Sequence, residues 1–498
     1  MSEKIIELQN IEKYFAGVHA LDDVSLNIEK GEVRCLAGEN GSGKSTLIKI
    51  IAGVYKRDGG NIRINGRDYP TIHPIDSIRE GIHVIYQDFS LYPNLSVAEN
   101  LSINTQIEKN KKFINWKHCK QIANRALEEI DVHIDLEELV MNLSVADKQL
   151  VEISRALWHE AKLIIMDEPT TALTQKEVDS LFRVIKRMQG DGISTLFVSH
   201  KLREVTEISE KITILRNGKK VADGNVSDFD EKKITYYMTG REVSNSRYEF
   251  DLSKRKNDFL TVKNLSRENV YKNISFELKK GEILGITGLL GSGRTDLALS
   301  LMGIKPYTSG EIFINKQKQN IRNINDAISC GFGYVSEDRL TTGIFDEQSV
   351  SRNIFISTID DFLDFFGFID SNKIDHEVSR WIEELSIATS SFDIPVKSLS
   401  GGNQQKVVLA RWLATQAKVL ILNGPTVGVD IGSKMDIHEK LRKLARAGLS
   451  IILISDDIPE ILQTCVRIFI MHRGEIVHTM DAHDSTEKTV AEYLSKLK

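Results

Sequence analysis

The chain has 498 residues, of which 27% are charged, and a formal net charge of −5. This length predicts at least two domains, each large enough to bury a core, and the acidic balance disfavours a nucleic-acid partner. No apolar run reaches the roughly 18 residues of a membrane-spanning helix, and the first residues carry no signal-peptide core. Four widely spaced cysteines disfavour a zinc site and indicate free thiols.

A glycine-rich segment near the N-terminus precedes a helical pattern that runs from Ser45 to Ala52. A loop of this kind points backbone N–H groups at phosphate oxygens, and the helix N-terminus adds partial positive charge. In this motif Lys44 reaches the β- and γ-phosphates and Ser45 can ligate Mg²⁺, whereas a glycine-rich turn without a ligand is the alternative. The residues expected to bind the ATP phosphates are Gly38, Glu39, Asn40, Gly41, Ser42, Gly43, Lys44, Ser45 and Thr46.

Two residues outside this loop are also candidates for nucleotide contact. Phe15 lies 29 residues before Lys44, where an aromatic ring can stack on adenine, and core packing is its alternative role. Gln87 follows a predicted strand over 82–86 and can sense both the metal and the γ-phosphate. We therefore expect Phe15 to bind the base and Gln87 to contribute to metal binding and catalysis.

Two further buried strands are predicted at 163–166 and 194–198, and each precedes polar residues suited to catalysis. Asp167 can hold magnesium through water, and Glu168 can orient or deprotonate the attacking water. His200 can contact the γ-phosphate; a lone histidine is usually structural, but its place 33 residues after Asp167 favours function. The candidate metal ligands are Ser45, Gln87 and Asp167, and the candidate catalytic residues are Glu168, His200 and Gln87.

The second half of the chain repeats the first at nearly constant spacing. Its glycine-rich segment, 288–295, has Arg294 where the first has Lys44, at an offset of 294 − 44 = 250 residues. Farther along, the offset becomes 256, so that Asn423 and Gly424 take the places of Asp167 and Glu168. Alternating buried strands and helical patterns predict α/β domains with largely parallel sheets in both halves.

The run Leu399-Ser400-Gly401-Gly402-Asn403-Gln404-Gln405 is the most specific motif of the chain. It is similar to the signature of ABC ATPases, in which two cassettes clamp ATP head to tail. The resemblance implies that each site combines the phosphate loop of one cassette with the signature of the other. The signature residues expected to contact ATP are Ser400, Gly401, Gly402 and Gln404.

On this basis one composite site is complete and the other is degenerate. The first joins Lys44, Glu168 and their neighbours to the second-half signature, and every element is present. The second lacks the metal-supporting carboxylate and the general base, and its signature, 143–149, has lost both glycines. Its altered residues are Arg294, Glu337, Asn423, Gly424, Asp456, Val145 and Ala146.

Over nearly its whole length the chain resembles the tandem ATP-binding subunit of bacterial ribose/galactose-type monosaccharide importers. The resemblance is carried by 38–46, 288–295, 334–339 and 399–405, whereas Asn423-Gly424 departs from the Asp-Glu that this family keeps. It implies two fused ABC-type P-loop nucleotide-binding domains, each an α/β fold with a mainly parallel sheet and a helical subdomain. The expected boundaries are 1–240 and 259–498, joined by a polar linker over 241–258.

The same resemblance implies an ATPase that uses ATP and Mg²⁺ to energise sugar import. Two membrane permease subunits and an extracytoplasmic sugar-binding protein would be its partners, with no nucleic acid. The two domains would pair within the chain, and the chain would lie at the cytoplasmic face of the cell membrane as a peripheral protein. Segments 89–104 and 339–353 are expected to face the permeases, and the sugar is not predicted.

Two other kinds of tandem ABC ATPase are alternatives. A cytosolic ATPase acting on ribosomes usually keeps both sites competent and has a longer, charged helical linker. A DNA-repair ATPase would carry zinc-binding cysteines and a long coiled-coil insertion, and neither feature occurs in this sequence. The short linker and the degenerate second site therefore favour the transporter subunit.

Overall fold

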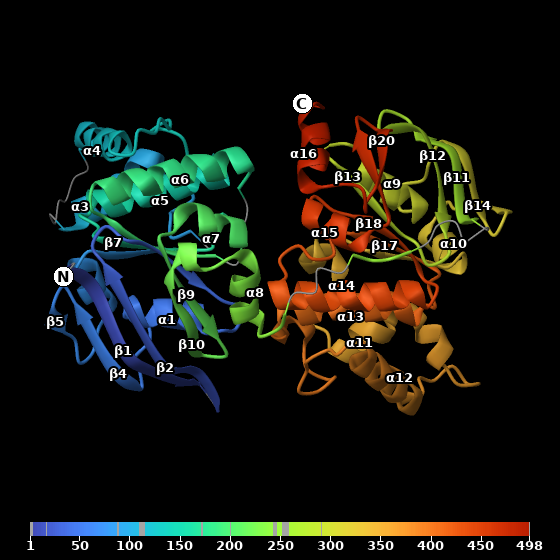
Figure 1. Cartoon of the computed structure of the whole chain (residues 1–498), viewed down its shortest axis with the longest axis horizontal. Coiled ribbons are helices and arrows are strands. Elements are labelled where there is room, and N and C mark those ends of the chain that lie inside the picture. The colour runs from blue at the N-terminus through green and yellow to red at the C-terminus, as the bar shows by residue number, and fades with distance from the viewer. Residues whose placement is uncertain are drawn as a thin grey trace. The chain divides into compact units, whose positions relative to one another are not determined.

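The computed structural model describes residues 3–15, 17–86, 89–108, 115–170, 173–199, 201–242, 247–250, 258–289 and 291–497. It divides into two compact units, 1–243 and 244–498, and each is described by itself (Figure 1). Within the described ranges, no helix is both long and apolar enough to cross a membrane. The four cysteines are free thiols, as predicted.

The first unit is built around a six-stranded sheet of order β10-β9-β3-β8-β7-β6. All its pairs are parallel except β9 with β10. Strands β3 and β8 are buried at every position, because helices and a second sheet cover their two faces. The strands are β3 (Val33–Ala37), β6 (Ile82–Ile85), β7 (Leu163–Asp167), β8 (Ser194–Val198), β9 (Lys211–Arg216) and β10 (Lys219–Asn225).

The second sheet of this unit is antiparallel, with the order β2-β1-β4-β5. Its apolar side packs with β3 and with α1 (Lys44–Ile51), the helix that follows the phosphate loop, in one hydrophobic cluster. This packing fixes the direction of α1 and therefore of the loop before it. The strands are β1 (Lys4–Phe15), β2 (Val18–Glu29), β4 (Gly59–Ile64) and β5 (Arg67–Asp68).

The remaining helices of the first unit fall into two groups. Three of them share a small hydrophobic core of their own and form a helical subdomain: α3 (Val97–Glu108), α4 (Trp116–Glu128) and α5 (Val145–Trp158). The others belong with the sheets: α2 (Pro74–Arg79), α6 (Gln175–Gly190), α7 (Leu202–Ile208) and α8 (Glu231–Thr239). Helix α6 begins with a capping box of Thr174 and Glu177, which satisfies its first backbone donors.

The second unit repeats this architecture. Its main sheet has the order β16-β17-β18-β13-β19-β20, which is the first-unit order read from the other edge, and its antiparallel sheet has the order β12-β11-β14-β15. The strands are β11 (Asp258–Arg267), β12 (Tyr271–Lys279), β13 (Ile283–Gly288), β14 (Ser309–Ile314), β15 (Gln317–Gln319), β16 (Phe332–Val335), β17 (Val419–Asn423), β18 (Ser450–Ile454), β19 (Arg467–His472) and β20 (Glu475–Asp481). The duplicated fold expected from the offsets is confirmed.

Helices of the second unit correspond to those of the first. Figure 1 shows α11, α12 and α13 gathered apart from the antiparallel strands of the same unit, as a helical subdomain. The helices are α9 (Arg294–Leu301), α10 (Ile324–Ser329), α11 (Val350–Phe355), α12 (Ser371–Glu384), α13 (Gly401–Ala414), α14 (Ile431–Arg446), α15 (Ile458–Thr464) and α16 (Glu487–Ser495). A 3₁₀ segment, η5 (Ile356–Phe362), follows α11.

Part of the segment expected to be a linker, 241–258, packs on the second unit. The Arg247 guanidinium donates to the carbonyls of Ala482 and His483, at 2.6 Å each. The Tyr248 hydroxyl, buried, donates to the carbonyl of Gly281 at 2.9 Å. Residues 243–246 and 251–257 of this segment lie outside the described residues.

Candidate active site

The phosphate loop of the first unit lies between β3 and α1, and its glycines have different reasons to be glycine. A Cβ on Gly38 would lie 2.4 Å from the carbonyl oxygen of Leu215, and one on Gly43 would lie 2.7 Å from that of Ala20. Both positions therefore permit close packing against neighbouring strands. A Cβ on Gly41 would meet nothing within 4 Å, but its φ of +79° favours glycine. The loop backbone therefore packs against β9 and β2 at Gly38 and Gly43, whereas none of the described residues would contact a Cβ at Gly41.

Lys44 begins α1 and is only 6% exposed. Its Nζ donates to the carbonyl oxygens of Gly38 and Glu39 at 2.8 Å each, which draws the loop around the ammonium group. The Ser42 hydroxyl is buried and has no hydrogen-bond partner among the described residues. A positive charge, an unsatisfied hydroxyl and a helix N-terminus in one loop fit a phosphate group.

Asp167 ends β7 next to the loop, where its carboxylate accepts a hydrogen bond from the Ser45 hydroxyl. Burial raises the pKa of Asp167, and the neighbouring charge of Glu168 raises it further, whereas Lys44 opposes the rise. Two oxygen donors that face each other from different elements suit a hard divalent cation such as Mg²⁺. The structure thus brings Ser45 and Asp167 together, as the sequence predicted.

Glu168 has a strained backbone, with φ at +50°. Its N–H donates to the carbonyl of Val198 on β8 at 3.0 Å, which holds the peptide in place. A left-handed conformation costs a residue with a side chain about 1–2 kcal/mol. The matching position, Gly424, keeps this conformation with φ at +58° but has no side chain to strain. Strain retained at a carboxylate and absent from its counterpart is typical of a functional position.

Phe15 lies at the end of β1 and is 38% exposed, so it is not a core residue. Its ring contacts Tyr55 edge to face at 5.3 Å, and the Nζ of Lys13 lies 5.1 Å from its centroid. One side of the ring is thus supported, as a platform for a base would require. The two other candidates, Gln87 and His200, lie outside the described residues.

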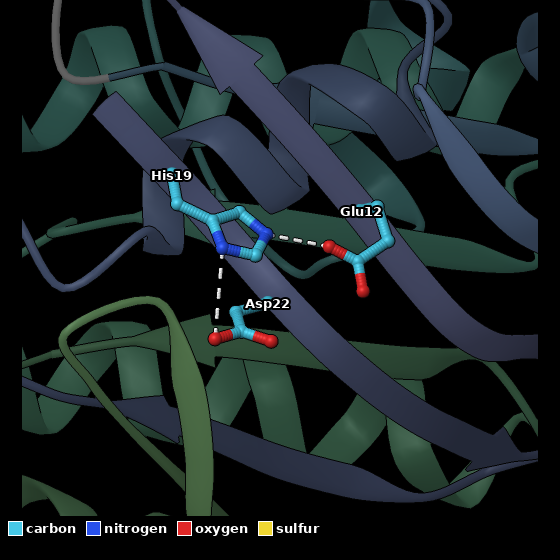
Figure 2. A group of neighbouring side chains, drawn as sticks. All are labelled: Glu12, His19 and Asp22. Atoms are coloured by element: carbon cyan, nitrogen blue, oxygen red, sulfur yellow. Dashed lines mark hydrogen bonds and ion pairs between the residues drawn. The ribbon is translucent and has the colours of Figure 1, made fainter. Parts of the chain in front are cut away.

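Figure 2 shows a group of three polar side chains on the hairpin that carries Phe15. His19 Nε2 lies 2.5 Å from Glu12 Oε2, and His19 Nδ1 lies 3.6 Å from Asp22 Oδ2. Asp22 also pairs with Lys219 at 2.9 Å, and the His19 ring stacks on Tyr14 with centroids 4.1 Å apart. These contacts tie β1 to β2 and connect the hairpin to the β9–β10 turn.

In the second unit, the cation of the matching loop is paired with a carboxylate of the same unit. Arg294 begins α9, donates to the carbonyl of Gly288 at 2.9 Å, and forms an ion pair with Asp456. Asp456 occupies the position that corresponds to His200 and follows β18. A carboxylate at this position repels a phosphate, and here it also pairs with the cation that would attract one.

The metal position of the second unit has also changed. The Asn423 side-chain amide donates to the Thr295 hydroxyl at 3.3 Å, and 3.5 Å separates it from the Tyr334 hydroxyl. An amide supplies no negative charge to balance a cation. A cavity of about 180 Å³ remains there, and its lining includes Arg294, Glu337, Asn423, Gly424 and Asp456. At the positions of Asp167 and Ser45 the second unit has Asn423 and Thr295, an amide in place of the carboxylate.

The two signature serines use their hydroxyl groups differently. Ser144 caps α5: its Oγ accepts from the N–H of Asp147 at 3.1 Å and donates to the Asp147 carboxylate at 2.8 Å. Ser400 accepts from the Asn403 side chain at 3.0 Å, and its proton has no acceptor in the part of the chain that the structure describes. Ser400 can therefore donate to a phosphate, whereas Ser144 is engaged beside a negative charge.

Packing within the second unit explains one signature glycine. A Cβ on Gly402 would lie 2.2 Å from the Ser433 hydroxyl, so α13 and α14 can approach only with glycine there. A Cβ on Gly401 would lie 3.1 Å from the Arg339 guanidinium, which also donates to Gln404 Oε1 at 3.2 Å. Gln404 is 7% exposed, and its amide donates to the carbonyl of Leu399, the first signature residue, at 3.1 Å.

Two residues that contact the signatures were missed at the level of sequence. Asp147, which is hydrogen-bonded to Ser144, aligns with Asn403 at the offset of 256. The replacement of an amide by a carboxylate beside the signature serine was therefore visible in the alignment of the two halves. Arg339 lies in the matched stretch 334–339, but only the fold shows that its guanidinium lies against the signature. Burial lowers the pKa of Arg339, and its Nη1 lacks a hydrogen-bond partner among the described residues.

Comparison with known proteins agrees with this arrangement. The family model described as ABC transporter matches residues 21–171 and 271–427, once in each unit. A ribose import ATP-binding protein RbsA of Clostridium perfringens (strain SM101) is 41% identical over 98% of this chain and 97% of its own length. Its counterpart in Caldanaerobacter subterraneus is 37% identical, over 98% of both chains.

A third relative has a broader name. It is a putative ribose/galactose/methyl galactoside import ATP-binding protein of Agrobacterium fabrum, 38% identical over 99% of this chain and 97% of its own length. The family matches and these near full-length relatives confirm the resemblance inferred from the motifs. The chain belongs to the ATP-binding proteins of the ABC transporter family and carries two such domains.

Proposed function

We propose that the chain is the ATP-hydrolysing subunit of an importer for a monosaccharide of the ribose or galactose kind. The observation that carries the proposal is the similarity, over 98% of the chain, to proteins named for ribose import. The relatives reported above are all named for import, which favours this function over the alternative of an ATPase acting on ribosomes.

Within this function, the first unit holds the nucleotide. Lys44 and the backbone of 38–46 bind the phosphates, and Phe15 supports the base. Ser45, Asp167 and Gln87 hold Mg²⁺, which when bound supplies positive charge against the phosphate oxygens. Glu168 takes the proton of the attacking water, and His200 and Gln87 orient the γ-phosphate. The Ser45–Asp167 hydrogen bond and the strained Glu168 backbone support these roles.

We further propose that the second unit completes this site with its signature. Ser400 would donate its hydroxyl proton to the γ-phosphate, and the amides at the start of α13 would add the partial positive charge of a helix N-terminus. The unused Ser400 proton supports this role. The reciprocal site, with Arg294 and Ser144, would not hydrolyse ATP, because its cation and its serine are both engaged by carboxylates.

The proposal includes the partners of the chain. Two permease subunits in the membrane and an extracytoplasmic sugar-binding protein would select and carry the sugar, and the chain would lie at the cytoplasmic face of the membrane. No nucleic acid takes part. The sugar is chosen by these partners, so its identity has to come from the transport assay.

The test is transport by the assembled complex in lipid vesicles. The chain, its permease subunits and the binding protein should import radiolabelled ribose or galactose only when ATP is supplied on the side of the chain. The Glu168→Gln variant should assemble and fail to transport. A chain that sediments with ribosomes and does not assemble with permeases would contradict the proposal.

A further inference from the structure

The helical subdomain of the second unit carries an exposed loop of aromatic residues between η5 and α12. We call residues 363–369 the aromatic hairpin. Phe365, Phe366 and Phe368 are 97%, 80% and 70% exposed, and Ile369 is 50% exposed. No other large apolar side chain in the described ranges is as exposed as Phe365. Clustered apolar exposure of this extent marks an interaction surface more often than chance.

The hairpin is an ordered structure. Leu363 and Ile369 form an antiparallel bridge, and the N–H of Asp364 donates to the carbonyl of Phe368 at 2.8 Å. The Asp364 carboxylate accepts from the N–H groups of Phe366 and Phe368, at 2.8 and 2.9 Å. The rings of Phe365 and Phe366 meet edge to face at 5.5 Å. The backbone is thus preorganised, so a partner does not have to order it on binding.

The base of the hairpin is anchored in the core of the subdomain. Phe362, 8% exposed, packs edge to face on Phe355 of α11, with centroids 6.2 Å apart. Beside this anchor lies a shallow depression of about 400 Å³, lined by Phe362, Asn372, Lys373, His376 and Glu377. The surface therefore offers projecting rings and an adjacent hollow on one rigid support.

The negative charge around the hairpin favours a basic protein surface over an anionic membrane surface as its partner. Residues 356–370 contain four aspartates and no lysine or arginine. On the following helix, Lys373 pairs with Asp370 at 3.5 Å and Arg380 pairs with Glu377, so the nearest cations are already compensated. The anionic cytoplasmic leaflet of a membrane would repel this acidic rim. The cytoplasmic loops of membrane proteins carry an excess of lysine and arginine, which would attract it.

We propose that the aromatic hairpin docks into an apolar depression with a basic rim on the cytoplasmic side of a membrane permease subunit. This proposal rests on the proposed function. It adds to segments 89–104 and 339–353 an anchoring element that the sequence did not indicate. The rings would supply the buried centre of the contact and the aspartates its charged edge, the usual anatomy of a protein interface.

The experiment compares full-length variants in complex with the permease subunits of the same transporter, in detergent. Phe365, Phe366 and Phe368 are changed together to serine. The matched control changes Ile75 and Ile78 of α2 to serine, which are 52% and 51% exposed and lie in the first unit. We expect the triple variant to bind the permeases at least about tenfold more weakly, with unchanged ATPase of the chain alone, and the control to bind normally.

A second variant tests the charge independently of the rings. Asp360→Lys with Asp361→Lys, both exposed, should weaken assembly and reverse its salt dependence. Normal assembly by both variants would overturn the docking proposal and leave the proposed function intact, whereas a wild-type chain that does not bind permeases would overturn the function itself. Flotation of the wild type, but not of the triple variant, with anionic phospholipid vesicles would assign the hairpin to lipid and contradict the proposal.

Discussion

The phosphate loops of the two units share a backbone conformation at the helix start but differ in the charged groups around the loop cation. Gly43 and Gly293 begin their helices with φ values of 103° and 92°, and Lys44 and Arg294 both donate to the first glycine carbonyl of their loop. In the first unit the loop faces a carboxylate bonded to a serine hydroxyl, whereas in the second the cation is paired with Asp456. The fold has been kept, and the charges that would bind nucleotide have been cancelled.

This difference shows which features of the loop are structural. The glycines, the helix start and the bond from the loop cation to the first glycine carbonyl survive in both units, because they are needed for β3 and α1, or β13 and α9, to pack. Beyond the loop, whose cation has changed from Lys44 to Arg294, the residues at 167, 168 and 200 have become Asn423, Gly424 and Asp456. We therefore propose that competence depends on those neighbours, and changes there should affect the two units unequally.

The largest effect is expected for the Glu168→Gln variant. The amide keeps the shape of the side chain but cannot accept the proton of water, so steady-state ATP hydrolysis should fall by about 10²- to 10⁴-fold. Binding of ATP, followed by equilibrium titration with a fluorescent analogue, should be retained. Hydrolysis near the wild-type rate would show that Glu168 is not the base and would remove the main contrast with Gly424.

The two signature serines provide the next contrast. Ser400→Arg should reduce hydrolysis by at least about 100-fold, because it removes a donor to the γ-phosphate and blocks the approach of α13. Ser144→Arg removes only a helix cap, which lowers the stability of its unit by about 1 kcal/mol and leaves hydrolysis within a few-fold of wild type. Both rates are measured at saturating ATP. Equal losses would mean that both signatures serve active sites.

A smaller effect is expected when the second loop is released from its internal ion pair. Asp456→Asn removes the carboxylate from Arg294, and the affinity of the second unit for a non-hydrolysable ATP analogue should rise about tenfold, or about 1.4 kcal/mol. The measurement uses a Lys44→Ala background to weaken the first site. The control is Glu311→Gln on β14, which breaks another exposed ion pair of the same unit. An unchanged affinity would show that the Asp456 carboxylate does not weaken nucleotide binding at this loop.

The smallest effect concerns the strained backbone at position 168. Because φ is positive there, the Glu168→Gly variant should be more stable than Glu168→Ala by about 1 kcal/mol. At the exposed helical position Arg183 of α6, the order should be reversed by a similar amount. Urea unfolding of the nucleotide-free proteins gives both differences. If the alanine variant were more stable than the glycine variant at both positions, the backbone of Glu168 would not be strained.

The fold and the phosphate loop could be predicted from the sequence, whereas the pairing of side chains around the loop could not. The nearly constant offsets predicted two copies of one fold, since Lys44 and Asp167 are 167 − 44 = 123 residues apart and Arg294 and Asn423 are 423 − 294 = 129 residues apart. That Asp456 reaches Arg294, however, depends on how β18 and α9 are placed in three dimensions. Spacing along the chain identifies such residues as neighbours of the loop but does not show which of them bind each other.

The same limit applies to the signature glycines and to the aromatic hairpin. Gly402 was expected to contact ATP, and the structure adds that a side chain there would clash with Ser433 of α14, a residue 31 positions away. The sequence pattern of 363–369 does not by itself distinguish an exposed hairpin from a buried stretch. Their exposure becomes evident only once Phe362 is seen to fill the core and the hairpin to project beyond it.

The most direct test of the central claim, that one of two similar loops performs all the hydrolysis, is the ATPase activity of Lys44→Ala beside that of Arg294→Ala. Each variant removes the loop cation, and thermal melting first establishes that each is folded. We expect Lys44→Ala to lose at least about tenfold in ATPase activity, since a charge-assisted hydrogen bond contributes about 1.5–3 kcal/mol. The ATPase activity of Arg294→Ala should stay within a factor of about three of the wild-type activity, because the Arg294 guanidinium is paired with Asp456. Comparable losses in the two variants would contradict the claim.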